Sequence, residues 1–311
     1  MDHGTSVSVT TNPDHRLIRA ATYASVAVAV ILIGAKFVAW RMTGSVSLLS
    51  TLLDSILDAG ASLVNLIAVR HALQPADKEH RFGHGKAEAL AGLAQAAFIA
   101  GSAAFLVIEG ISRLFDPIPV LRGTVGLSVM GFSIVVTVAL VAFQMYVVRR
   151  TKSVAISADS LHYRADVLVN IGVVVAIAIS TFWSQPLADP IIALLISVYI
   201  LRGAWEISQS SLDILMDREL PDEDRERIIS LVLENEDVQG VHDLRTRSSG
   251  PDIFIQMHLD LDPHMPLLYA HGVSEEVEAR LIKAFPNAEV IIHEDPAGFD
   301  ETHPDLKPDP S

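Results

Sequence analysis

Long apolar runs alternate with short polar connections over the first two thirds of the chain. A run of about 20 apolar residues matches the thickness of a bilayer's hydrocarbon core when it is helical. Linkers such as Thr43-Gly44 and Ser184-Gln185-Pro186 contain residues that typically end helices. The pattern predicts six membrane helices, at residues 17–40, 46–69, 87–112, 123–148, 155–183 and 187–208.

From Asp217 onward the apolar runs shorten and the pattern becomes that of a water-soluble domain. The alternation of apolar and polar residues over 253–259 is typical of a strand with one buried face. The expected elements are a helix over 221–234, strands over 241–247 and 253–259, a helix over 267–285 and a strand over 289–293. This order predicts a small two-layer α+β unit.

These elements divide the chain into four expected parts. Residues 1–16 form a tail, 17–209 a six-helix membrane domain, and 210–296 the α+β domain. The proline-rich residues 297–311 are expected to be disordered.

Composition supports a membrane protein with an acidic soluble domain. Half of the residues are hydrophobic, and the mean hydropathy is +0.38. The segment after Met216 contains 23 of the 37 acidic residues but only 8 of the 23 basic ones. A net charge of −14 argues against nucleic acid as a partner and suits the attraction of small cations. Because the chain has no cysteine, any metal must be held by histidine and carboxylate side chains.

Basic residues near the ends of the apolar runs predict how the helices are oriented in the membrane, because cytoplasmic loops carry an excess of Lys and Arg. The side assigned to the cytosol carries Arg16, Arg19, Arg70, Arg81, Lys86, Arg149, Arg150, Lys152 and Arg202. The opposite side carries Arg41, Arg113 and Arg122. Both termini are therefore expected in the cytosol.

Two pairs of polar residues lie inside apolar helices. Asp54 and Asp58 are four residues apart in the second run, and His162 and Asp166 repeat that spacing in the fifth. Residues four apart share a helix face, so two such helices can offer three carboxylates and an imidazole to one zinc-like ion. A charged Asp at mid-membrane depth costs about 2.5–3.5 kcal/mol, which argues for a functional role. The alternative is that these residues only bond neighbouring helices or face a water-filled vestibule.

Two further clusters contain metal-ligand side chains. The loop between the second and third runs contains Asp77, His80 and His84, which a closed loop can gather at one ion, although a solvated polar loop explains them equally well. The soluble domain contains a third cluster of potential metal ligands, although each of them taken alone could be an ordinary surface residue. They are His242, His258, His271, His293 and Asp295.

Several motifs of the chain resemble the cation diffusion facilitator family, and within it the bacterial ferrous-iron and zinc efflux subgroup. They are Leu53-Asp54-Ser55-Ile56-Leu57-Asp58, Phe82-Gly83-His84-Gly85-Lys86-Ala87-Glu88, Asp159-Ser160-Leu161-His162-Tyr163-Arg164-Ala165-Asp166, His242-Asp243-Leu244-Arg245-Thr246-Arg247 and Ile291-Ile292-His293-Glu294-Asp295-Pro296. The resemblance extends from about Leu17 to Pro296.

The resemblance implies specific roles for these residues. Asp54, Asp58, His162 and Asp166 would form the transport site, and Asp77, His80 and His84 a second metal site. His242, His258, His271, His293 and Asp295 would form a binuclear site in a ferredoxin-like, metallochaperone-like cytoplasmic domain that dimerises. Lys86 and Asp217 would form a salt bridge that interlocks the homodimer.

Together these observations predict a transporter, not an enzyme. The expected transporter exports divalent metal ions in exchange for protons, because protons and metal compete for the same ligands. Zinc-restricted members of the family often have His at the position of Asp54. A span with two Asp residues is expected to accept Zn²⁺, Fe²⁺, Cd²⁺, Co²⁺ or Mn²⁺ as substrate and regulatory ligand.

Three rival functions are considered. A membrane metalloenzyme lacks support because the chain has no His-Glu-x-x-His motif. A metal sensor or scaffold without transport leaves the intramembrane pairs unexplained. A channel differs from an antiporter in that it cannot move metal uphill.

Overall fold

The computed structural model describes residues 13–44, 46–115, 124–183 and 187–298. The chain divides into two compact units, with the division after Leu212. The first unit is helical, and the second combines helices with a sheet.

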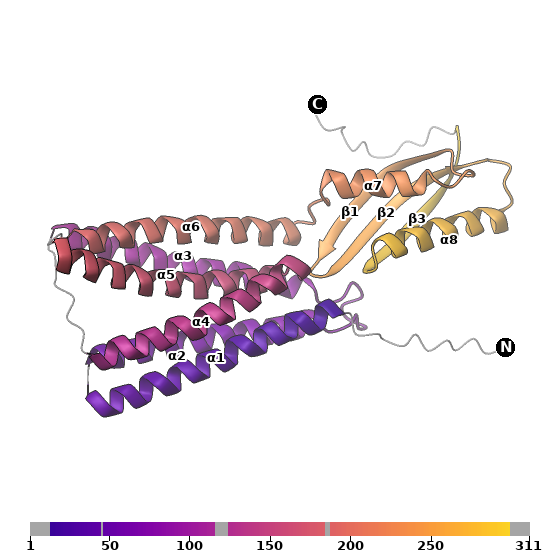
Figure 1. Ribbon diagram of the computed structural model, residues 1–311. Coiled ribbons are helices and arrows are strands. Elements are labelled where there is room, and N and C mark those ends of the chain that lie inside the picture. The colour runs from indigo at the N-terminus through magenta and orange to yellow at the C-terminus, as the bar shows by residue number, and fades with distance from the viewer. Residues whose placement is uncertain (1–12, 45, 116–123, 184–186, 299–311) are drawn as a thin grey trace. The chain divides into compact units, whose positions relative to one another are not determined.

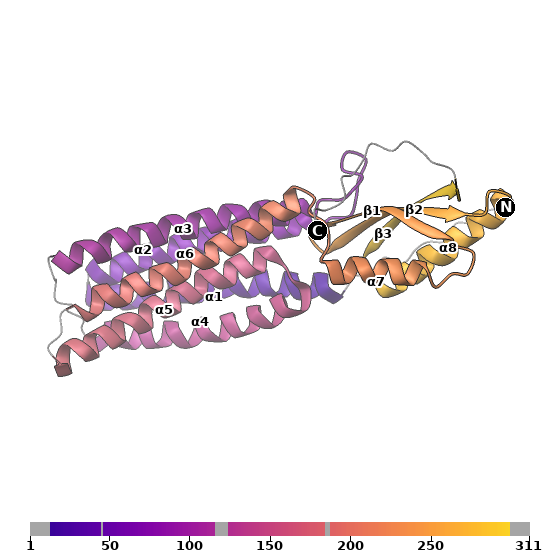
Figure 2. The same ribbon diagram turned by 90° about the horizontal axis from the view of Figure 1, so that it is seen from above.

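Six long helices occupy the first two thirds of the chain and run alongside one another (Figure 1 and Figure 2). Among the residues described, five helices are long and apolar enough to cross a membrane, namely α1, α2, α3, α4 and α6. The fold class is confirmed as a multi-pass membrane protein with an α+β domain. The helices are α1 (Pro13–Thr43), α2 (Val46–Ala72), α3 (Lys86–Phe115), α4 (Thr124–Thr151), α5 (Val154–Trp183) and α6 (Ala188–Leu215).

The helices extend up to about two turns beyond the apolar runs, because polar residues continue a helix once it leaves the apolar layer. α1 begins at Pro13, four residues before the expected start at 17, and α6 continues to Leu215 instead of ending near 208. α1 ends where Gly44 adopts φ 62°, and its N–H donates to the carbonyl oxygen of Trp40 at 2.8 Å. Glycine adopts this left-handed conformation without strain, which suits it to the end of a helix.

A buried polar network holds the helices together. Asp159 of α5 is fully buried. One of its carboxylate oxygens, Oδ2, lies 2.5 Å from Ser25 Oγ of α1 and 2.7 Å from Gln144 Nε2 of α4, while Oδ1 accepts from Gln95 Nε2 of α3 at 3.2 Å. Ser62 of α2 adds a 2.9 Å hydrogen bond to the Tyr163 hydroxyl of α5. These bonds fix the position of α5, which carries two of the expected ligands, relative to four other helices.

The second unit has the predicted order of helix, strand, strand, helix, strand. Its elements are α7 (Asp222–Val232), β1 (Gly240–Ser249), β2 (Asp252–Leu261), α8 (Leu267–Ala284) and β3 (Ala288–Pro296). The sheet has the order β1-β2-β3, with β1 and β2 antiparallel and β2 and β3 parallel. Ile255, Met257 and Leu259 alternate along β2 and pack with α7 and α8 residues in one core, as the period of two predicts.

Candidate metal-transport site

Three ligand side chains meet between α2 and α5. His162 Nε2 lies 3.1 Å from Asp58 Oδ1 and 4.0 Å from Asp166 Oδ2. One ligand atom of each residue lies within 4.8 Å of the others. Tetrahedral zinc holds its oxygen and nitrogen ligands about 3.3 Å apart, from bonds of about 2.0–2.1 Å. The three atoms are therefore close to the spacing that one ion requires.

The imidazole of His162 is held in place by its surroundings. Its ring lies edge-on to Tyr163 and Phe98, with centroid distances of 5.4 and 6.3 Å. Its Nε2 is buried and has no hydrogen bond of normal geometry within the described part of the chain. A buried nitrogen that faces two carboxylates without such a bond is well placed to bind a cation.

Asp54 lies one helical turn before Asp58 but outside this group of three. It lines a cavity of about 270 Å³ together with Asp58 and Asp166. The structure therefore places three of the four expected transport ligands at one point, and the fourth, Asp54, lines a cavity that Asp58 and Asp166 also line. Other polar residues that line this cavity are Lys36, Thr51, Ser55, Ser133, Thr137, Tyr163 and Asn170.

Lys36 is a site residue that the sequence reasoning missed. Its ammonium on α1 donates to Ser55 Oγ at 2.5 Å and to the Thr51 carbonyl oxygen at 3.2 Å. It also interacts electrostatically with Asp58, Asp166 and Asp54. A signal was present in the sequence, because a lysine inside an apolar span is rare and typically functional.

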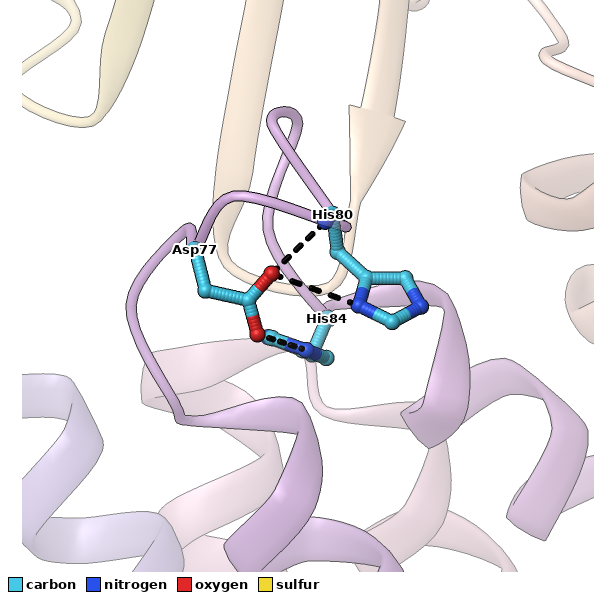
Figure 3. A group of neighbouring side chains, drawn as sticks. All are labelled: Asp77, His80 and His84. Atoms are coloured by element: carbon cyan, nitrogen blue, oxygen red, sulfur yellow. Dashed lines mark hydrogen bonds and ion pairs between the residues drawn. The ribbon is translucent and has the colours of Figure 1, made fainter.

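The loop between α2 and α3 brings Asp77, His80 and His84 together (Figure 3). Asp77 Oδ1 lies 3.4 Å from His80 Nδ1, and Asp77 Oδ2 lies 3.4 Å from His84 Nε2. Oδ1 also accepts hydrogen bonds from the backbone N–H groups of His80 and Glu79, at 2.7 and 2.8 Å. The His80 bond is the main reason why the pKa of Asp77 lies below its ordinary value. One ionised carboxylate and two imidazoles fit a zinc-like ion.

His71, at the end of α2, joins this loop cluster and was not assigned from the sequence. Its ring lies edge-on to that of His84, with a centroid distance of 4.6 Å. The His84 Nδ1 atom is buried and has no hydrogen-bond partner among the residues described.

A third group lies on the sheet of the second unit. Asp295 of β3 is buried, and its Oδ2 lies 2.7 Å from His258 Nδ1 and 3.3 Å from His242 Nε2. Its other oxygen, Oδ1, lies 3.1 Å from His293 Nε2. The register explains this arrangement, because His242 pairs with His258 across β1 and β2, and His258 with His293 across β2 and β3. Asp260, which was not predicted, approaches His242 Nδ1 at 3.5 Å.

The structure does not bring His271 into this group. It lies on α8, where its Nε2 is 3.4 Å from Glu275 Oε1 and its side chain is 63% exposed. Its neighbour Ala270 and Val273 face the core instead. The packing face of α8 therefore turns His271 toward solvent.

Lys86 and Asp217 belong to different units, so the expected salt bridge between them remains a prediction. Lys86 is the first residue of α3. Within the second unit, Asp217 Oδ1 lies 3.3 Å from Arg247 Nη1.

The fold and the three clusters define a multi-pass membrane protein with groups of potential metal ligands. Residues 22–216 match the model of the cation efflux transmembrane domain, and residues 220–297 match the cation efflux protein, cytoplasmic domain. The chain belongs to the cation efflux family, known as the cation diffusion facilitators, which confirms the predicted resemblance. Because this family consists of transporters, the prediction that the chain is not an enzyme is also confirmed.

Similar proteins cover nearly the whole chain. The cation-efflux pump FieF of Serratia proteamaculans is 48% identical over 281 residues, which is 90% of this chain and 93% of that protein. The cation-efflux pumps FieF of Shigella boydii and Escherichia coli K12 are each 48% identical over 282 residues, with the same shares covered.

Proposed function

We propose that this protein exports divalent transition-metal cations from the cytosol in exchange for protons, and that Asp58, His162 and Asp166, with Asp54, hold the cation. The observation that carries this proposal is the convergence of three ligand atoms within 4.8 Å on two membrane helices. Membership of the cation efflux family supports export, and the relatives named cation-efflux pumps support a cation as cargo.

The donor set favours Zn²⁺ and its neighbours. An imidazole with carboxylates suits Zn²⁺, Fe²⁺, Co²⁺, Cd²⁺ and Mn²⁺, whereas K⁺ or Mg²⁺ would not require the imidazole. The two aspartates on α2 make the site rich in oxygen, which favours a broad range of metals over strict selection of zinc.

Protons and metal compete for the same four ligands, because carboxylate and imidazole bind metal only when deprotonated. This competition is the physical basis for the proposed exchange. The cavity beside the site is lined by Lys36 and Thr51, which lie toward the turn between α1 and α2. With the termini in the cytosol, this is the outward end, so protons entering there would displace the ion outward.

The proposed setting is a bacterial inner membrane with residues 17–209 embedded and both termini cytoplasmic. The cytoplasmic part, residues 210–296, would dimerise two copies and regulate them, and residues 297–311 would form a tail. The match of residues 220–297 to the cytoplasmic domain of cation efflux proteins supports this division, as does the asymmetry of basic residues at the helix ends.

The test is zinc flux in proteoliposomes containing the full-length protein. We expect Asp58→Asn and His162→Ala to reduce flux about 10–100-fold, the usual result of damaging a metal site. Glu109→Gln is the matched control, since Glu109 is an acid of α3 that pairs with Arg113 instead of facing the site. Wild-type flux in both site variants would exclude this transport site.

Proton exchange is tested separately in the same vesicles. Zinc should accumulate uphill when a pH gradient is imposed, and an ionophore that collapses the gradient should abolish the accumulation. Downhill flux alone would indicate a channel, and metal binding without flux would indicate a sensor or scaffold.

A further inference from the structure

A basic cavity of about 410 Å³ lies between α4, α5 and α6, apart from the metal clusters. Lys152, Arg164 and Arg202 line it, together with apolar side chains that include Val154, Leu161 and Ile207. Lys152 lies between α4 and α5, Arg164 lies within α5, and Arg202 lies on α6, where its side chain is 81% exposed. Basic residues inside membrane helices are rare and typically mark a binding site or pathway.

The cavity is suited to an anion and unsuited to a metal cation. Arg164 donates from Nη1 to the Tyr199 hydroxyl and from Nε to the Ser160 carbonyl oxygen, both at 3.3 Å, so neutral groups position it. Arg202 pairs with Glu206 at 3.0 Å. Glu206 is the one carboxylate among the described residues that line the cavity, so the three basic side chains leave a net positive charge.

An apolar groove continues from this cavity. The groove has a volume of about 490 Å³ and shares Arg164 and Tyr199 with the basic cavity. Its other lining residues are Val138, Val141, Val167, Leu168, Leu195 and Ile196. A charged compartment joined to a hydrocarbon-lined one has the two-part chemistry of a phospholipid.

We propose that this groove binds an anionic phospholipid of the cytosolic leaflet, with its phosphate in the basic cavity and an acyl chain against the apolar groove. Charge complementarity favours an anionic headgroup, and basic pockets between membrane helices on the cytoplasmic side typically bind such headgroups. The continuous apolar wall explains why a lipid fits better than a free anion, which would leave that wall without a partner.

The bound lipid would contact the helix that carries the transport ligands. Successive residues of an α-helix are about 100° apart, so Arg164 lies on the face of α5 roughly opposite His162 and Asp166. Lipid binding on that face would set how firmly α5 packs against α6. The lipid site itself does not depend on the proposed function. Any change in metal flux that the lipid causes through the packing of α5 does rest on it.

The test measures lipid retention by native mass spectrometry of the full-length protein. Phosphatidylglycerol and phosphatidylcholine with identical acyl chains are compared. We expect wild-type protein to retain the anionic lipid preferentially, and Arg164→Gln with Arg202→Gln to weaken its binding about fivefold for each basic residue removed. Val141→Trp, which fills the apolar groove and keeps every charge, should also displace the lipid.

Arg149→Gln with Arg150→Gln is the matched control, because both arginines are exposed in the last turn of α4 and do not line the cavity. Size-exclusion profiles and thermal unfolding verify that the variants fold. Equal retention of the two lipids, or unchanged retention in the Arg164/Arg202 variant, would overturn the proposal. Displacement of the lipid by inorganic phosphate alone would overturn it as well.

Discussion

Charge balance at the proposed transport site depends on one residue outside the ligand set. Asp54, Asp58 and Asp166 carry three negative charges when ionised, and a neutral His162 adds none. Lys36 supplies one positive charge to the same cavity. The residues together therefore carry a charge of −2, which a divalent cation neutralises.

Replacing Lys36 with Met should make the protein bind metal more tightly and release it more slowly. Removing one cation leaves a site of charge −3, and a unit charge several ångströms away changes binding by about 1–2 kcal/mol, or about tenfold. Zinc flux over a range of concentrations should show a lower KM and a lower kcat. Lys36→Arg keeps the charge and should remain near wild type. A raised KM in the Met variant would contradict this role.

Asp77 has two separable functions in the loop cluster. Its Oδ1 accepts two backbone N–H groups, while its Oδ2 faces His84. In Asp77→Asn an amide oxygen replaces the carboxylate oxygen as the acceptor, and the charge is lost. The substitution should therefore preserve the loop and weaken metal binding about 10–100-fold. Equilibrium dialysis of the full-length protein should show the loss of one bound zinc equivalent.

Asp262→Asn is the control for this change, because Asp262 likewise accepts the backbone N–H of a nearby histidine, His264, at 2.8 Å. The lowered pKa of Asp77 adds a pH signature. The ionised Asp77 carboxylate contributes fully to the stability of the fold above its unfolded-state pKa of about 3.9. This contribution is lost only as the pH falls through the lower pKa of the folded state. Thermal unfolding should therefore show that the Asp77 carboxylate stabilises the loop down to about pH 4. Loss of this contribution well above pH 4 would contradict the assignment.

At the level of elements, α5 is positioned by hydrogen bonds that the sequence could not reveal. The i, i+4 spacing of His162 and Asp166 predicted their shared face, since spacing within one helix is a local property. Asp159 lies in the same motif, yet its partners come from α1, α3 and α4. Lys36 was missed although a lysine inside an apolar span was a signal in the sequence; only its contacts with α2 depend on packing that local spacing does not reveal.

Removing the Asp159 carboxylate should loosen α5. Asp159→Ala leaves the donors of Ser25, Gln95 and Gln144 without their acceptor in a buried position, at a cost of about 2–4 kcal/mol in stability. Thermal unfolding in detergent should occur at a markedly lower temperature, and zinc flux should fall because the transport ligands shift.

The neighbouring Ser160→Ala provides the control for Asp159. Ser160 is also fully buried, but its Oγ has no hydrogen-bond partner in the described part of the chain. Removing that hydroxyl should leave stability unchanged or slightly improved. Equal destabilisation by both substitutions would show that the Asp159 network adds nothing beyond packing.

Apolar run length predicted the existence and order of the helices, because the bilayer imposes that length. It did not predict their ends, as α6 shows by continuing to Leu215. The strands of the soluble unit followed from the period of two, which also placed His258 opposite the buried face of β2. The assignment of His271 to the metal site stays a prediction, because the described structure places its side chain on the exposed side of α8, a face that tertiary packing selects and the sequence does not reveal.

At the scale of the whole molecule, the acidic second unit offers a cation-binding group that is separate from the membrane helices. Three strands deliver His242, His258 and Asp295 to one place. A ligand that binds this folded arrangement and not the unfolded chain stabilises the domain. If the chain forms the expected dimer, metal at this group would regulate transport by binding one arrangement of the two copies more tightly than the other.

Asp295→Asn should therefore remove the response of this unit to zinc. Asp295 is buried and contacts three imidazoles, so losing its charge removes the carboxylate that the histidines share. At about 100 times Kd, zinc should stabilise the wild-type unit by about 2.7 kcal/mol, measured by thermal unfolding of the full-length protein. Glu289→Gln, at an exposed acid of the same strand, should keep the full response. If zinc stabilises the Asp295→Asn protein as strongly as the wild type, the three-strand group does not bind the metal. If the stabilisation is lost but flux still depends on cytosolic zinc, the group binds metal without regulating transport.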